Sequence, residues 1–216
     1  MLSKSVIGED GGFTWQYFAK VFQKKYYQRA IWGSLKISAT VTLITVLLAT
    51  PLAYIMSTVK IRFASALQIL ILVSSMSAPF IGAYAWIMLC GRNGTITNFL
   101  LNTFGIKLGD IYGFKGCVIV MSLQLYSLVF MFVSGAFKNM DNSLIEASES
   151  LGCSGIRKIF KVVLPLILPT LLSGALMVFM RTFADYGTPM LIGENYNTLP
   201  VVVYKAVSYT HLTLPT

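Results

Sequence analysis

Charged side chains are scarce in this chain, at 12% of its 216 residues, whereas 56% of the residues are hydrophobic. A soluble domain of this length carries roughly 25% charged residues. The composition therefore excludes an ordinary soluble domain. It predicts an all-α protein that crosses a membrane several times, because helices satisfy their own backbone hydrogen bonds in lipid.

Cysteine and histidine are also rare, with three cysteines and a single histidine. Cys90, Cys117 and Cys153 lie too far apart for a metal cluster or a disulfide framework. The sequence contains no nucleophile–base pattern and no phosphate-binding loop of the form Gly-x-x-x-x-Gly-Lys-Ser/Thr. These absences predict a protein that is not an enzyme and has neither a metal site nor a cofactor of its own.

This chain has a net charge of +9, and a positive net charge is the one feature that it shares with nucleic-acid-binding domains. Here the basic residues are scattered among the segments between apolar runs, without interleaved aromatic residues. We therefore expect membrane lipid, and not nucleic acid, as the surrounding partner.

Four apolar runs are long enough to cross most of a bilayer, and they cover residues 35–56, 66–89, 116–133 and 164–183. Residues 1–30 contain no such run and are predicted to form an extracytoplasmic loop with an interfacial segment. Residues 31–206 form the predicted transmembrane domain, with a short interfacial helix expected near residues 96–104. Residues 207–216 match the translation of a sequencing adaptor codon by codon, so they are predicted to be a non-native tail.

A polar segment at residues 138–163 separates the third and fourth apolar runs and is predicted to lie outside the membrane. Asn142 or Ser143 can cap a helix start, and Ser143 and Glu146 have the spacing of a capping box, in which each side chain bonds a free backbone amide. Gly152 suits the left-handed residue that ends a helix. The segment is therefore expected to form two amphipathic helices joined by a bend at Gly152.

This segment resembles the cytoplasmic loop signature of binding-protein-dependent ABC transporter permeases. The family pattern is Glu-Ala-Ala, three residues, Gly, nine residues, Ile, one residue, Leu-Pro. The residues that match it at the same spacing are Glu146, Ala147, Gly152, Leu164 and Pro165. Ser148 and Val162 are small, conservative departures from it. Further similarities lie at Ser34-Leu35, at Pro51-Leu52-Ala53-Tyr54 and at Asp185-Tyr186-Gly187-Thr188-Pro189.

The resemblance implies a polytopic helical bundle of the ABC permease type, in which four of five core spanning helices are present. It also implies a multi-pass protein of the bacterial inner (plasma) membrane. Its expected partners are cytoplasmic ATP-binding subunits that use ATP, an extracytoplasmic substrate-binding protein, and a second permease half, fused or separate.

The same resemblance implies that residues 142–165 couple the permease to its ATPase. The residues expected to carry this coupling are Glu146, Ala147, Ser148, Gly152, Arg157, Lys158, Leu164 and Pro165. We expect the apolar face of the bent element to enter a groove of the ATPase, which is a common mode of helix recognition. The alternative is a solvated helical loop that rests on its own bundle.

Three polar residues near or within the apolar runs are possible pathway residues. Gln124 lies inside the third run, where it either faces the translocation path or forms an interhelical hydrogen bond. Arg181 and Asp185 are four residues apart, so they could pair across one helical turn. That pair would lie either at the membrane interface or beside the path.

The substrate is expected to be ferric iron, because residues 183–199 resemble the ferric iron group of this family. Polyamine, thiamine, phosphonate and sulfate are the alternatives, and a non-transporting membrane scaffold is the alternative class of function. The resemblance places the loop in the cytoplasm. Only six of the seventeen basic residues would then lie inside, which the positive-inside rule does not favour.

Overall fold

In the computed structural model, the residues described are 24–59, 62–75, 78–105, 111–150, 152–153 and 155–212. These residues form helices joined by short connections, and no strand occurs among them. The predicted all-α fold class is therefore confirmed.

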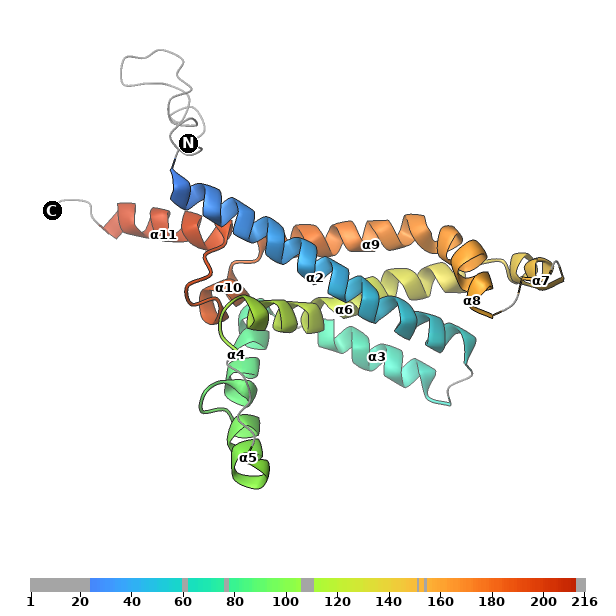
Figure 1. Ribbon diagram of the computed structural model, residues 1–216, viewed down its shortest axis with the longest axis horizontal. Helices are drawn as coiled ribbons and strands as arrows, with labels where there is room; N and C mark the ends of the chain where they lie inside the picture. Colours follow the sequence, from blue (N-terminus) through green and yellow to red (C-terminus); the bar gives the residue numbers. More distant parts are fainter. Residues whose placement is uncertain are drawn as a thin grey trace, which may run out of the picture.

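Three long apolar helices make up the body of the molecule. They are α2 (Lys25–Thr58), α6 (Phe114–Lys138), and a helix in which η2 (Ile159–Val163) continues into α9 (Leu164–Ala184). All three are long and apolar enough to cross a membrane. They run side by side along the long axis, and each contacts the other two (Figure 1).

The core lies along the seam between these helices. Its most deeply buried members are aliphatic or aromatic and include Ile37, Val41, Val129, Phe130 and Val178. Small residues let the helices approach closely, which is how helices associate in lipid. A Cβ atom placed on Gly174 of α9 would lie 3.2 Å from the Cβ of Phe132 on α6.

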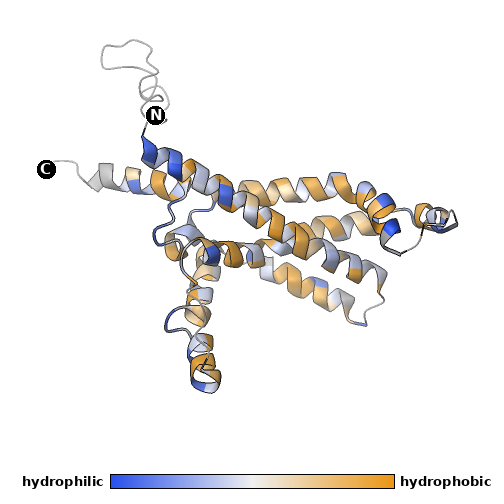
Figure 2. Cartoon of the chain, viewed as in Figure 1, coloured by the Kyte–Doolittle hydropathy of each residue, from blue (hydrophilic) through white to orange (hydrophobic). Residues whose placement is uncertain are grey.

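The first long helix begins earlier than the sequence predicts. The apolar run starts at residue 35, yet α2 begins at Lys25 and ends at Thr58. No proline interrupts residues 25–35, so the helix extends past the apolar run into a polar end, visible in blue in Figure 2. Residues 25–30 of the predicted extracytoplasmic segment therefore belong to α2. Residues 1–23 lie outside the described part of the chain, and the location of the segment stays a prediction.

The second predicted span, residues 66–89, is not one helix. It consists of α3 (Ala64–Ser75) and α4 (Pro79–Cys90), which run in different directions (Figure 1). Pro79 is in the first turn of α4, and Ala78 before it has extended backbone angles. A proline clashes with a preceding helical residue, so the break falls here. The expected single span was wrong for this reason.

The remaining helices lie at the two ends of the bundle. At one end, called the loop end, are α7 (Asn142–Ser150) and α8 (Gly155–Lys158). The opposite end, called the far end, carries α10 (Gly187–Ile192) and the start of α11 (Leu199–Leu212). A helix lies where a short interfacial helix was predicted, α5 (Thr95–Phe104), and its position at the membrane interface stays a prediction. The helix α11 runs across residue 207 without a break, so the structure shows no boundary there. The non-native origin of residues 207–216 stays a prediction.

Candidate functional site

The polar loop between α6 and α9 begins with a capped helix. The backbone N–H of Ser143 donates to Oδ1 of Asp141 over 2.9 Å, and this bond holds the pKa of the Asp141 carboxyl below its usual value. A carboxylate at this position satisfies a free amide and favours the positive end of the helix. The cap of α7 is therefore Asp141 and not the predicted Ser143.

A tight bend ends α7 as the sequence predicts. Gly152 has a φ of 82°, in the left-handed region. Its N–H donates to the carbonyl of Glu149, and the N–H of Cys153 donates to the carbonyl of Ser148, each over 2.9 Å. These two bonds form the Schellman motif, which needs a left-handed residue at this place. The prediction for the backbone of Gly152 is confirmed.

Beyond the bend, the chain forms one continuous helix that runs into α9. The backbone remains helical at Lys158 and at Leu164, where α8, η2 and α9 meet. Leu164 and Pro165 begin α9, but helix precedes them, so Pro165 lies inside this continuous helix and removes one of its backbone hydrogen bonds. The π-helical turn η2 lies between the loop and the span, and such turns often occur at functional positions.

An ion pair joins the two arms of the bend. Nζ of Lys158 lies 2.5 Å from Oε1 of Glu149, and this hydrogen bond raises the pKa of Lys158. The Lys158 side chain is only 18% exposed, whereas that of Glu149 is 53% exposed. Arg157, which the sequence analysis gave the same role as Lys158, is exposed instead.

The apolar face of α7 is only partly covered by the bundle. Leu144 is 47% exposed, and Ala147 and Glu146 are also exposed. Ser148 is buried, and its hydroxyl donates to the carbonyl of Ile145 over 2.7 Å. The helix therefore turns Ser148 inward and leaves Leu144 and Ala147 accessible to a partner.

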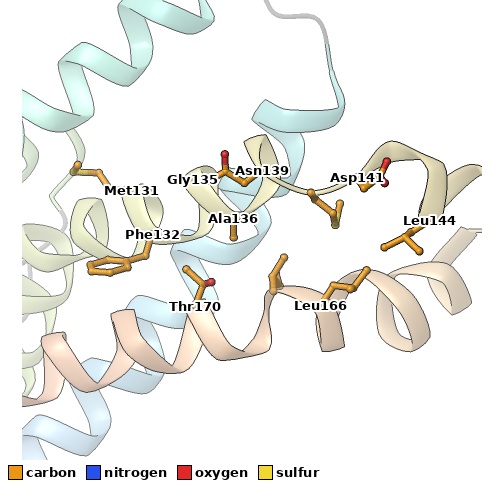
Figure 3. Close-up of a pocket in the computed structure, with 11 residues that line it drawn as sticks. Met131, Phe132, Gly135, Ala136, Asn139, Asp141, Leu144, Leu166 and Thr170 are labelled. Atoms are coloured by element: carbon orange, nitrogen blue, oxygen red, sulfur yellow. The ribbon is translucent and has the colours of Figure 1, made fainter.

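A groove of about 680 Å³ opens beside this face, between the loop-end halves of α6 and α9. In Figure 3, Leu144 and Leu166 point toward one another at one end, and Ala136 faces Thr170 across the middle. Its lining is mostly apolar and comprises Met131, Phe132, Gly135, Ala136, Asn139, Met140, Asp141, Leu144, Leu166, Ile167 and Thr170. The groove could not be read from the sequence, because its walls come from three separate helices.

The predicted pathway residues lie elsewhere and are not brought together with the loop. Gln124 packs against α4, where a Cβ atom on Gly82 would lie 3.3 Å from its Nε2 atom. Asp185 does not pair with Arg181 in the described structure. Its Oδ1 atom accepts a hydrogen bond from the N–H of Gly187 over 2.9 Å, at the start of α10. Arg181 is exposed.

A bundle of apolar helices with a bent, partly exposed helical loop at one end is the architecture of a membrane transport permease. The chain belongs to the family described as the binding-protein-dependent transport system inner membrane component, whose model matches residues 39–213. The predicted permease fold and the predicted multi-pass location in the inner membrane are confirmed at this level.

The chain is 27% identical over 203 residues to the ferric transport system permease protein of Actinobacillus pleuropneumoniae, covering 93% of this chain but 29% of that protein. It is 27% identical over 202 residues to the spermidine/putrescine transport system permease protein of Haemophilus influenzae, covering 89% and 70%. The chain thus spans less than a third of the ferric relative.

The fold itself is similar to a solved transporter. A crystal structure of a bacterial alginate ABC transporter, in complex with a periplasmic protein bound to an alginate pentasaccharide, aligns with a TM-score of 0.76. The alignment covers 92% of this chain and 73% of that chain at 16% sequence identity.

Proposed function

We propose that this chain is the membrane-spanning part of an ABC importer and that residues 142–165 dock onto a separate cytoplasmic ATPase. The observation that carries the proposal is the exposed apolar face of α7, Leu144 and Ala147, on a loop that also has the family spacing. An apolar face on a rigid, capped helix is suited to a hydrophobic groove on a partner.

In this proposal the ATPase dimer closes on ATP binding and opens after hydrolysis. The docked loop carries that motion into the spans, which then open alternately to the two sides of the membrane. A binding protein outside the membrane delivers the substrate, and a second permease half completes the path. This chain contributes α2, α6 and α9 to that bundle.

Ferric iron is the proposed substrate. Support comes from the ferric relative, which aligns with 93% of this chain. The spermidine/putrescine relative is equally identical, at 27%, so a polyamine is the candidate to be tested beside iron. Gln124, Arg181 and Asp185 remain possible pathway residues in this proposal.

The docking step is tested with the full-length permease and the ATPase encoded beside it. We expect Leu144→Asp to abolish co-purification of the two proteins, because a charge would replace an apolar contact. Leu144→Met is the matched control, since it keeps an apolar side chain of similar volume. Membrane levels of both variants are measured to exclude misfolding.

Transport is measured with the same proteins in proteoliposomes that contain ATP. We expect radioactive ferric iron to be taken up from its binding protein. This uptake should be lost in Leu144→Asp and kept in Leu144→Met. A Leu144→Asp variant that still binds its ATPase would contradict the docking proposal. Uptake of putrescine in place of iron would correct the substrate.

A further inference from the structure

The orientation of α7 depends on few contacts with the rest of the chain. Its main neighbours in the described structure are α8 and η2. The connection to α8 contains two glycines with positive φ, Gly152 at 82° and Gly155 at 59°. A Cβ atom on either glycine would meet nothing within 4 Å. Beyond the two backbone bonds at Gly152, no side-chain packing around these two glycines in the described residues therefore fixes the angle between α7 and α8.

The Glu149–Lys158 ion pair is the side-chain link that spans this connection. The two residues are nine positions apart, on opposite sides of both glycines, and their charged atoms are 2.5 Å apart. The Lys158 side chain is largely enclosed, with 18% of its surface exposed, and it lies in α8 at the start of the long helix. Lys158 therefore ties Glu149 of α7 to that helix.

Lys158 is also the residue at which α8 passes into η2. From there the helix continues without a break through α9 to the far end of the molecule. Lys158 is therefore placed at the loop end of a spanning helix.

We propose that the Glu149–Lys158 pair is a strut that sets the angle of α7 and transmits force from α7 to α9. This inference rests on the proposed function, because the force would come from the docked ATPase. Glu149 and Lys158 are positioning residues in this mechanism, and the exposed face of α7 makes the contact with the partner.

The opposing expectation is that the pair contributes nothing, as many exposed ion pairs do. A charge swap distinguishes the two. Glu149→Lys and Lys158→Glu each place two like charges beside one another, whereas the double variant restores an opposite pair in reverse. If the pair acts as a strut, the angle of α7 is disturbed in both single variants and restored in the double variant.

The first measurement uses the full-length permease without its ATPase. Spin labels at Ala147 and Arg157, both exposed, report the angle between α7 and α8 as a distance distribution. We expect a narrow distribution in the otherwise unchanged protein, broad ones in the single reversals, and a narrow one again in the double variant. Equal widths in all four proteins would overturn the inference, whatever the ATPase does.

The second measurement counts substrate molecules transported per ATP in proteoliposomes. Each single reversal is expected to lower this ratio roughly two- to fivefold, which is the size of effect expected when one exposed ion pair is lost. The double variant is expected to restore the ratio. An unchanged ratio in the reversals would overturn the strut. The Leu144→Asp variant tests the docking proposal independently of the strut. Loss of the complex with the ATPase in that variant supports docking even if the strut is overturned, whereas a complex that persists in that variant contradicts docking.

Milder variants guard against loss of folding. Glu149→Gln and Lys158→Gln remove the charge without creating repulsion, and they are expected to broaden the distance distribution less than the reversals. Distributions as narrow as in the unchanged protein for both neutral variants would also count against the strut.

Discussion

Replacing Gly152 with valine tests whether the bend in the loop controls ATPase binding. Gly152 has a φ of 82°, and a Cβ atom there would meet nothing within 4 Å. The substitution therefore leaves packing unchanged and strains only the backbone. For a β-branched residue in the left-handed region, we expect a cost of about 2–3 kcal/mol, in the upper part of the usual range.

Two backbone hydrogen bonds, from Gly152 and Cys153, close the turn at Gly152 itself. At about 1 kcal/mol net for each bond, they favour the bent loop by about 2 kcal/mol. Subtracting the strain reduces the bent fraction from nearly all molecules to between roughly one half and one sixth. If the ATPase binds only the bent loop, its apparent Kd rises by about two- to sixfold.

The assay is a binding titration of the ATPase against the full-length permease in nanodiscs. Gly152→Asn is the matched control at the same site, because asparagine tolerates the left-handed region. Gly105→Val is the control elsewhere, since Gly105 has a φ of 65° with equally open space but ends α5. An unchanged affinity in Gly152→Val, or an equal loss in Gly105→Val, would refute the reasoning.

Two further substitutions probe the bundle that carries the loop. Gly174→Val places a side chain against Phe132, whose Cβ would lie 3.2 Å from the new Cβ, so we expect a loss of about 1–3 kcal/mol and a lower melting temperature in detergent. Gly135→Val, with nothing within 4 Å, should leave the melting temperature nearly unchanged, and an equal fall in both would contradict this account. Tyr196→Phe removes the hydroxyl that donates to the Gly33 carbonyl over 2.6 Å, and we expect a loss of about 1 kcal/mol in the same assay. A Tyr196→Phe melting temperature equal to that of the unchanged protein would show that this bond adds no stability.

Several features of this protein could be predicted because they depend on neighbouring residues alone. Long apolar runs predicted the helices at α2, α6 and α9, since each helix satisfies its own backbone and needs only enough apolar length. Glycine is the residue that most readily accepts a positive φ, so Gly152 predicted the bend. The proposed docking residues followed from spacing, and their role is still a prediction.

Other features depended on local competition that the sequence leaves open. The apolar run at 66–89 looks continuous, yet Pro79 divides it into α3 and α4. Asp141, Asn142 and Ser143 are all good capping residues, and only the path of the chain out of α6 selected Asp141. Asp185 and Arg181 could have paired within one helix, but α9 ends at Ala184, and the Asp185 carboxylate accepts a hydrogen bond from the N–H of Gly187 instead.

Composition, apolar length and motif spacing thus determined by themselves that this is a multi-pass helical protein with an exposed, bent loop. Tertiary structure alone decided which residues join the two arms of that loop and which residues form the groove beside it. The Glu149–Lys158 pair forms only because Gly152 and Gly155 fold α8 back toward α7. The groove between α6 and α9 exists only because Leu144 is brought beside Leu166. Both features are contacts between helices, and their geometry depends on how whole helices pack.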